Sequence, residues 1–247
     1  MKFLNRGDCR LAYDAIGGQS PGVLFCGGFM SDMSGSKASA LAAHCAAHDR
    51  AFVRFDYSGH GASDGRFIDG SIGRWRDDAL AALDELTAGP QVIVGSSMGG
   101  WIALLLALAR PERVQGLVLL APAPDFTHAI WEDELTAAER DRLLRDGYVE
   151  RPSEYSTEPY LITRRLIEDG RHHLLLGQPI DIDCPVRILH GMRDSDVAWQ
   201  RSITLMERLQ GDDVCLTLLK SGDHRLSNAD DLSRLCAVVE HLCAKSA

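Results

Sequence analysis

The sequence predicts an α/β protein in which a mostly parallel sheet is covered by helices on both faces. Short apolar runs are nearly continuous rather than alternating, as in strands that have a helix on each side. Segments with helical spacing separate these runs, and this alternation is typical of parallel sheets. The chain has 247 residues, 45% hydrophobic and 25% charged, which fits one large domain with a sizeable core.

The strands and helices are expected in regular alternation along most of the chain. The apolar runs that we interpret as strands are 23–28, 51–56, 91–96, 114–121, 186–191 and 214–220. Helical spacing is found at 35–48, 71–87, 98–110, 196–210 and 228–244. Residues 10–17 alternate between apolar and polar, which favours an antiparallel strand near the start. We therefore expect residues 1–247 to form a single domain.

Residues 122–181 interrupt this alternation and contain no convincing strand. They hold two helical patterns, 134–147 and 159–176, separated by the polar segment 148–158. An insertion of this length is too long for a simple loop. We interpret it as a small helical cap over the carboxyl edge of the sheet, where open α/β sheets bind ligands. The alternative is a second structural layer with no role in binding.

Charge and composition argue against several classes of partner. A net charge of −9 argues against a nucleic acid or an anionic membrane surface, which both require a basic face. The longest apolar stretch, 101–109, is about half of a membrane span, so no stable membrane insertion is expected. The first ten residues do not resemble a signal peptide. The seven cysteines are scattered without a CxxC pair, which indicates reduced thiols. A cytoplasmic protein is therefore expected.

The segment "VIVGSSMGG" at 92–100 fits the pattern G-x-S-x-G, with Ser97 at its centre. The pattern follows a predicted strand and opens a predicted helix, the context that a nucleophile elbow requires. A sharp turn strains the backbone at the serine, and the flanking glycines let strand and helix approach closely. The motif alone is equally compatible with a glycine-rich turn whose serine has no catalytic role. A base and an acid are needed to decide, because a free serine is a poor nucleophile.

The order of the remaining residues supplies both partners, since the base and the acid of such a site follow the serine in the order acid, then histidine. Of nine histidines, only His224 follows a predicted strand and precedes a helix on the loop edge that faces Ser97. The others precede the serine, fall in the insertion, or lie inside a strand or the last helix. Asp194 follows the predicted strand 186–191, which comes before the strand that leads to His224. Asp196 is the rival, although its position suits a helix N-cap better. Asp223 adjoins His224 and is better placed to cap the turn.

A reaction at Ser97 would also need donors for a developing oxyanion. One is expected to be the backbone N–H of Met98, which directly follows the serine. The other is expected from "CGGFMSD" at 26–32, where two glycines let the chain turn so that the N–H of Phe29 points inward. The alternative for this segment is an ordinary glycine turn.

Other conspicuous residues receive structural interpretations. In "DYSGHGASDG" at 56–65, we expect Asp56 and Asp64 to fix a turn, with no functional role for His60. The "RHH" at 171–173 is not a metal site, since adjacent helical residues face different ways, and no metal-binding motif is found. We therefore predict no metal and no organic cofactor. Some aromatic residues of the insertion are candidates for an acyl pocket, although each is more often plain core: Phe126, Trp131, Tyr148, Tyr155 and Tyr160.

Together these residues resemble the α/β-hydrolase superfamily. The segments "FVRFDYSGHGASDG", "GPQVIVGSSMGGW", "ARPERV", "CPVRILHGMRDSDVAW" and "DHR" are most similar to the abhydrolase domain-containing protein 10 group. The resemblance runs from about residue 20 to the end of the chain. It implies an α/β-hydrolase fold and an activity like that of the group, which is described as palmitoyl-protein thioesterases and esterases of acyl glucuronides. It also implies the roles of nucleophile, acid and base for Ser97, Asp194 and His224.

The leading hypothesis is a serine hydrolase that cleaves carboxylic thioesters or esters through an acyl-enzyme intermediate. Its substrate would be a small molecule or an acylated protein, with long-chain palmitoyl thioesters as one option. Two alternatives keep the same fold: a ligand-binding protein without turnover, and an acyltransferase or C–C hydrolase that uses the same three residues. A serine at the elbow disfavours chemistry that needs a carboxylate nucleophile.

Overall fold

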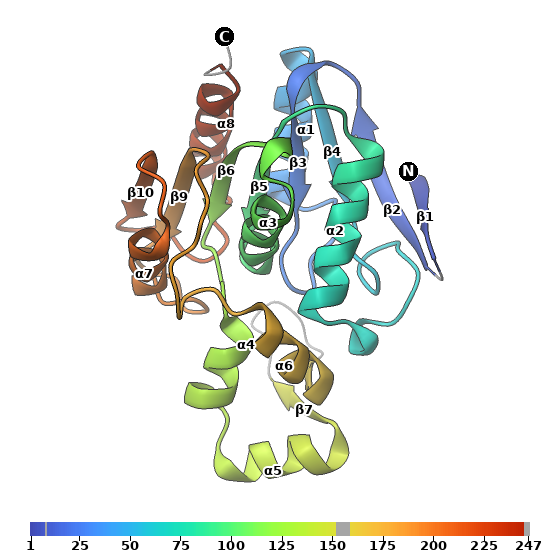
Figure 1. The fold of residues 1–247 in the computed structure, drawn as a ribbon, viewed down its shortest axis with the longest axis vertical. Coiled ribbons are helices and arrows are strands. Elements are labelled where there is room, and N and C mark those ends of the chain that lie inside the picture. Colours follow the sequence, from blue (N-terminus) through green and yellow to red (C-terminus); the bar gives the residue numbers. More distant parts are fainter. Residues whose placement is uncertain (8, 152–158, 245–247) are drawn as a thin grey trace.

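The fold was analysed in a computed structural model that describes residues 1–7, 9–151 and 159–244. Eight strands form the main sheet (Figure 1). In spatial order they are β1 (Lys2–Arg6), β2 (Cys9–Ile16), β4 (Arg50–Phe55), β3 (Gln19–Cys26), β5 (Gln91–Ser96), β6 (Val114–Leu120), β9 (Val186–Gly191) and β10 (Val214–Leu219).

The six strands predicted from apolar runs are the six parallel strands of this sheet, from β4 through β10 in spatial order. The alternating segment 10–17 was correctly predicted to be antiparallel: β2 pairs in that direction with both β1 and β4. Because the parallel strands run the same way, their carboxyl ends meet at one edge of the sheet. The loops after β3, β5, β9 and β10 therefore lie at a common edge.

Helices cover both faces of the sheet, as predicted. Helices α1 (Ser36–Ala47) and α8 (Ala229–Ala244) pack on one face. Helices α2 (Ile72–Leu86), α3 (Met98–Ala109) and α7 (Gln200–Arg208) pack on the other. In β5, Val92 and Val94 contact the first layer, while Ile93 contacts the second. This two-sided burial explains the continuous apolar runs in the sequence. Truncating Ile93 to alanine would cost about 2–5 kcal/mol of stability.

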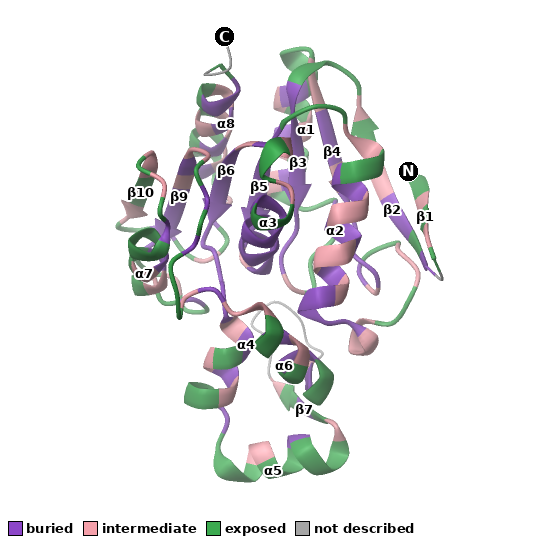
Figure 2. Cartoon of the chain, viewed as in Figure 1, coloured by how far each residue is buried: buried purple, intermediate pink, exposed green. Residues whose placement is uncertain are grey.

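Among the helices that cover the sheet, α3 is the most deeply buried, with residues 98–107 buried (Figure 2). Its packing against β5, β6 and the neighbouring helix α2 explains the nearly uniform apolar sequence of 101–109, which was too short for a membrane span. Among the described helices, none combines the length and the apolar character that crossing a membrane requires. All seven cysteines are free thiols.

Residues 122–181 are here named the insert. The described part of the insert, 122–151 and 159–181, contains a lobe beyond one end of the sheet (Figure 1). The insert contains α4 (Phe126–Ala129), a π-helical turn (Ile130–Glu134), α5 (Ala137–Asp146), β7 (Tyr148–Arg151), β8 (Tyr160–Thr163) and α6 (Arg164–Gly170). Helix α5 begins with a capping box made by Thr136 and Glu139 and ends at Gly147, whose φ of 86° suits glycine.

The expectation that the insert contains no strand is wrong. Strands β7 and β8 form an antiparallel pair, with Val149 opposite Ile162. Each strand has four residues, so neither is long enough to show a clear alternation of apolar and polar residues. The helical pattern expected at 159–176 starts only at Arg164, because Thr163 caps the helix by accepting a hydrogen bond from the N–H of Leu166. Tyr155, one of the aromatic candidates, lies outside the described residues.

Candidate active site

Ser97 lies at a strained turn between β5 and α3. Its φ of 55° and ψ of −118° place a non-glycine residue in a sparsely populated region of backbone space. The turn is held from both sides: the N–H of Ser97 donates to the carbonyl of Leu120 (2.9 Å), and its own carbonyl accepts from Ala123 (3.1 Å). The strain therefore lifts the hydroxyl out of the strand at the start of a buried helix.

Two glycines make this turn sterically possible. A Cβ atom on Gly95 would lie 2.3 Å from the carbonyl oxygen of Gly99, and one on Gly99 would lie 2.1 Å from that of Cys26. Both distances are far below van der Waals contact, and the opposing atoms are backbone. The strand, the helix and the loop after β3 are therefore closer together here than any side chain would allow.

His224 approaches Ser97 from the loop after β10. Its Nε2 lies 3.1 Å from the Oγ of Ser97, and its Nδ1 lies 2.7 Å from Oδ2 of Asp194. These distances allow the hydroxyl of Ser97 to donate to Nε2 while Nδ1–H donates to the carboxylate. Asp223, the neighbour of His224, accepts from the N–H of Leu226 (3.0 Å) and so caps the turn, as predicted.

Asp194 is the acidic partner of His224, and its carboxylate is fully buried. Its Oδ1 accepts the N–H groups of Asp196 (2.9 Å) and Val197 (2.8 Å). Burial by itself raises the pKa of Asp194, but the hydrogen bonds from His190 and His224 outweigh burial and hold this pKa well below its usual range. The carboxylate is therefore ionised at neutral pH.

Oδ2 of Asp196, the rival, lies 3.9 Å from Nε2 of His224, whereas Nδ1 of His224 lies 2.7 Å from Asp194. The predicted role of Asp196 as the N-cap of the following helix is wrong. Helix α7 begins at Gln200, and Trp199 occupies the N-cap position. Instead, the backbone N–H groups of Asp196 and Val197 donate to the carboxylate of Asp194.

His190 is a site residue that sequence reasoning missed. It lies in β9, is fully buried, and its Nε2 is 3.0 Å from Oδ2 of Asp194. Its Nδ1 is 2.7 Å from Oγ of Ser202, a buried residue of α7. The signal in the sequence was a histidine four residues before the candidate acid; its position inside a strand was interpreted as structural.

The loop after β3 contains Phe29, the first expected oxyanion donor. A Cβ atom on Gly28 would lie 3.5 Å from Cβ of Ser97, so the loop runs directly past the serine. Met98, the second expected donor, is the first residue of α3. Both residues thus flank Ser97. That their N–H groups bind a substrate oxygen stays a prediction.

The segment "DYSGHGAS" holds this loop in place. Asp56 accepts the N–H groups of Met33 (2.7 Å) and Ala62 (2.8 Å), and Asp64 accepts that of Arg10 (3.2 Å), so both aspartates fix backbone as predicted. His60 is more closely connected to the site than expected, because its Nε2 accepts the N–H of Met30 at 3.2 Å. Burial lowers the pKa of His60 to about 4, which keeps the ring a neutral acceptor.

The ring of Phe29 is surrounded by aromatic side chains, two from the segment 67–75 at the start of α2 and two from the insert. Phe67 and Trp75 contact it at centroid distances of 4.8 and 5.8 Å, and Phe126 and Tyr160 of the insert at 5.6 and 6.0 Å. All four contacts are edge-to-face, the favourable geometry for aromatic pairs. Phe126 and Tyr160 therefore lie near the candidate oxyanion loop.

Two other aromatic candidates lie elsewhere. The ring of Trp131 contacts two guanidinium groups, those of Arg140 (5.5 Å) and Arg171 (5.1 Å). Tyr148 is 41% exposed in β7. Neither arrangement favours a role in lining an apolar pocket.

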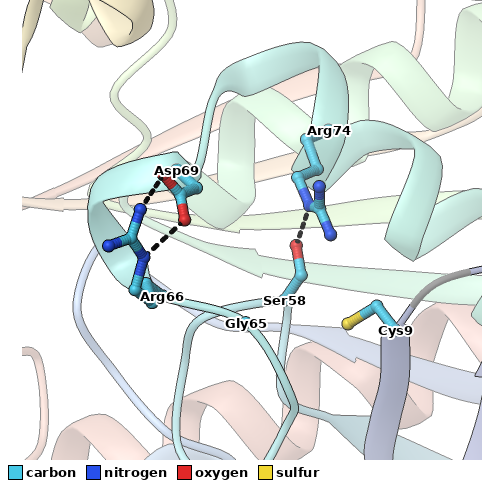
Figure 3. Close-up of a pocket in the computed structure, with 6 residues that line it drawn as sticks. All are labelled: Cys9, Ser58, Gly65, Arg66, Asp69 and Arg74. Carbon is cyan, nitrogen blue, oxygen red and sulfur yellow. Dashed lines mark hydrogen bonds and ion pairs between the residues drawn. The ribbon is translucent and has the colours of Figure 1, made fainter.

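Two cavities in the described part of the chain lie beside the N-terminus of α2. The smaller has a volume of about 140 Å³ and is lined by Cys9, Ser58, Gly65, Arg66, Asp69 and Arg74 (Figure 3). Arg66 pairs with Asp69 across it, and Nε of Arg74 donates to Ser58 (2.8 Å). The larger, about 320 Å³, shares Arg74 and is mostly polar. Ser97, Asp194 and His224 line neither cavity.

No described group of three or more His, Cys, Asp or Glu side chains is arranged to hold a metal ion. At 171–173, His173 Nε2 lies 3.7 Å from Oδ2 of Asp169, and its carbonyl accepts the indole N–H of Trp101 (3.0 Å). The bond from Trp101 connects the insert to α3.

An open, mostly parallel sheet with a strained serine at a strand-to-helix turn and an imidazole against its hydroxyl is the architecture of the α/β-hydrolases. The comparisons agree. The family model described as serine aminopeptidase, S33, matches residues 20–172. The palmitoyl-protein thioesterase ABHD10, mitochondrial, of Mus musculus is 41% identical over 247 residues, which cover 99% of this chain and 83% of the mouse protein. The chain therefore belongs to the ABHD10 family of α/β-hydrolases, and it is a hydrolase.

Solved structures support this assignment at the level of the whole fold. The α/β-hydrolase domain-containing protein 10 from mouse superposes with a TM-score of 0.91 and 40% identity, covering 100% of this chain and 99% of the mouse chain. A crystal structure of a candidate hydrolase from Agrobacterium vitis S4 gives a TM-score of 0.93 with 43% identity, covering 98% and 97% of the two chains.

The comparisons also correct one expectation. The ABHD10 proteins of mouse, rat and human are named mitochondrial, so the expectation of a cytoplasmic protein is wrong. That expectation rested on scattered free thiols and on the first ten residues. Free thiols are compatible with any reducing compartment, so they do not identify the cytoplasm.

Proposed function

We propose that the chain hydrolyses carboxylic thioesters or esters through an acyl-enzyme intermediate, with Ser97 as nucleophile, His224 as general base and Asp194 as the residue that orients His224. The observation that carries the proposal is the continuous hydrogen-bonded series from Ser97 to His224 (3.1 Å) and from His224 to Asp194 (2.7 Å). A serine hydroxyl becomes an effective nucleophile only when a base of this kind accepts its proton.

In the first half of the reaction, Oγ of Ser97 attacks the acyl carbon while its proton passes to Nε2 of His224. Asp194 keeps the Nδ1–H of His224 directed away from the serine and stabilises the imidazolium that forms. The N–H groups of Phe29 and Met98 stabilise the oxyanion, a term worth about 3–4 kcal/mol per donor in related chemistry. The imidazolium then protonates the leaving thiol or alcohol, and the acyl group stays on Ser97.

In the second half, water replaces the leaving group. His224 takes a proton from water as its oxygen attacks the acyl carbon, and the proton is then returned to Oγ of Ser97. The products are the free carboxylic acid and the regenerated enzyme. Every proton in this cycle is handled by His224, so the proposal requires no metal or organic cofactor.

The proposed substrate class is an acyl thioester or ester with an apolar acyl chain. The relatives are named palmitoyl-protein thioesterases, and we extend this substrate to the present chain as part of the proposal. Phe29, Phe126 and Tyr160 support it, because their rings provide apolar surface beside the loop that passes Ser97.

We further propose that the insert acts as a cap over the site within one domain spanning 1–247. The N–H of Ala123, at the start of the insert, donates to the carbonyl of Ser97 (3.1 Å). Later in the insert, the N–H groups of Leu175 and Leu176 both donate to Asp125 (2.8 Å each). These bonds hold the beginning and the end of the insert close to each other. Its apolar residues, such as Leu143 and Ile162, belong to the same buried cluster as α2 and α3.

Kinetics on matched substrates test this proposal. Ser97→Ala is expected to lower kcat for acyl thioesters and p-nitrophenyl esters at least about 10³-fold. Ser96→Ala is the matched control, because it removes the adjacent hydroxyl, which takes no part in the proposed reaction. Equal residual rates in the two variants would contradict the assignment of Ser97.

A series of acyl lengths on matched thioesters and esters tests the substrate class. A maximum of kcat/KM at long-chain thioesters is the expected result. A preference for short esters would reject the palmitoyl proposal and leave the general hydrolase intact. Tight binding of a small ligand with no hydrolysis across the series would favour the non-catalytic alternative.

A further inference from the structure

His190 connects a buried residue of α7 to the carboxylate beside His224. Its Nδ1 lies 2.7 Å from Oγ of Ser202, and its Nε2 lies 3.0 Å from Oδ2 of Asp194 and 3.0 Å from the carbonyl of Val197. Both His190 and Ser202 are fully buried. An uncompensated polar group in this position would be costly, so each of these contacts constrains the others.

The surroundings of the ring decide which nitrogen carries the proton. Nε2 faces two acceptors, the carboxylate of Asp194 and the carbonyl of Val197. A hydrogen is therefore required on Nε2, since two acceptors with no proton between them would repel one another. In the neutral ring Nδ1 is then an acceptor, and the hydroxyl of Ser202 can donate to it. The two acceptors thus select the tautomer in which His190 donates to Asp194, and Ser202 holds the other side of the ring.

As a result, the carboxylate of Asp194 has donors on all sides. Oδ2 accepts from His190 and from His224, while Oδ1 accepts the N–H groups of Asp196 and Val197. The bond from His190 also helps to hold the pKa of Asp194 well below its usual range against the effect of burial. Without His190, the backbone donors alone would hold Oδ1, and Oδ2 would be fixed only by the ring that it has to orient.

We propose that His190, held at Nδ1 by Ser202, is a positioning residue that fixes Oδ2 of Asp194 for the bond to His224. This inference rests on the proposed function. His190 does not contact the substrate and transfers no proton in the cycle. It keeps the Nε2 of His224 directed at Ser97, and so it acts on the chemical step rather than on substrate binding.

Three substitutions separate this role from simple packing. His190→Leu removes the donor while filling much of the space. His190→Gln keeps an amide N–H at about the place of Nε2 and is the conservative rescue. Ile188→Val, in the same strand and equally buried, is the control for a loss of packing that leaves the hydrogen bonds intact.

The expected result is a fall of kcat by about 10- to 100-fold in His190→Leu with KM nearly unchanged, comparable to the loss when the residue that orients a ligand of a catalytic metal is removed. His190→Gln is expected to recover most of this loss. Ile188→Val is expected to lower the midpoint of unfolding without lowering kcat. In proton NMR, the low-field signal of the His224 Nδ1–H is expected to shift in His190→Leu and to return toward the wild-type position in His190→Gln.

Two results would overturn the inference: a folded His190→Leu with the kcat of the wild type, or a His190→Gln as slow as His190→Leu with an unmoved low-field proton. Should His190→Leu fail to fold, Ser202→Ala provides the second test, because it removes only the partner of Nδ1. A fall of kcat by about fivefold or more in Ser202→Ala supports the role; an unchanged kcat contradicts it. Failure of the proposed function is separable, because it would be seen as wild-type activity that does not depend on Ser97.

Discussion

The backbone N–H of Met30 donates to Nε2 of His60 at 3.2 Å, so a buried histidine from the loop after β4 holds the loop after β3. Met30 has a φ of 56°, an uncommon conformation for a non-glycine residue. The residue before it, Phe29, is the proposed oxyanion donor. The bond to His60 therefore stabilises a strained backbone next to the group whose direction the reaction requires.

His60 is consequently expected to influence the rate of the chemical step. His60→Phe keeps an aromatic ring for its contacts with Phe67 and Trp75 (5.1 Å each) but cannot accept the N–H of Met30. We expect kcat to fall about tenfold, less than the roughly 10²- to 10³-fold loss on removal of an oxyanion donor, because the donor is displaced rather than removed. His60→Gln provides an acceptor at about the same place, and its kcat is expected to stay closer to the wild type. Similar rates for the Phe variant and the wild type would show that the loop keeps its position without this bond.

The pKa of His60 also predicts a pH dependence of stability. Burial lowers this pKa from an ordinary 6.5 to about 4, so between these values the unfolded chain binds a proton that the folded protein does not. The contribution of neutral His60 to the free energy of unfolding is thus fully present above about pH 6.5. It is lost as the pH falls toward 4, by roughly 2–3 kcal/mol. Urea unfolding of the wild type and of His60→Gln at pH 7.5 and pH 5 measures the difference. The prediction fails if the acid-induced loss is the same in both proteins.

Lys37 of α1 holds the loop that carries the proposed base. Its Nζ donates to the carbonyl of Arg225, the residue after His224, and burial lowers the pKa of Lys37 to about 8. Lys37→Met keeps the apolar stem and removes the donor, so we expect kcat to fall several-fold, because the bond sets the position of the loop. Lys2→Met, at an exposed position, is the control. Steady-state kinetics with one p-nitrophenyl ester decides the matter: equal kcat values in both variants would reject the role of Lys37.

The close approach at the serine turn predicts a large penalty for any side chain at Gly99. In Gly99→Ala, the new Cβ would lie 2.1 Å from the carbonyl oxygen of Cys26, so strand and helix must separate. We expect a loss of about 3 kcal/mol or more in the free energy of unfolding, together with a loss of activity. Gly177→Ala is the matched control, since no heavy atom lies within 4 Å of its Cβ position. Denaturant unfolding of both variants tests the prediction.

Much of the fold could be predicted because its strands are covered on both faces. Residues such as Ile93 and Val94 leave a continuous apolar signal, which is independent of any distant contact. Strands β7 and β8 were missed because each has four residues and each pairs only with the other. The beginning of α7 was placed too early, since Asp196 precedes an apolar pattern but its backbone N–H is used by Asp194.

For the site, the chain order of Ser97, Asp194 and His224 was sufficient to select residues that the structure brings within hydrogen-bond distance. His190 and His60 were not selected, because their importance depends on tertiary contacts with Ser202 and with Met30. A histidine inside a strand or a glycine-rich turn has the same sequence signature whether or not it supports a site. Spacing along the chain identifies residues at an edge, but it does not identify what holds them there.

The central claim is that Ser97 is the nucleophile, and peptide mapping of a covalent fluorophosphonate adduct tests it most directly. We predict one adduct on the wild-type protein, located at Ser97, with the same adduct in Ser96→Ala and none in Ser97→Ala. An adduct at another residue, or equal labelling of Ser97→Ala, would contradict the account.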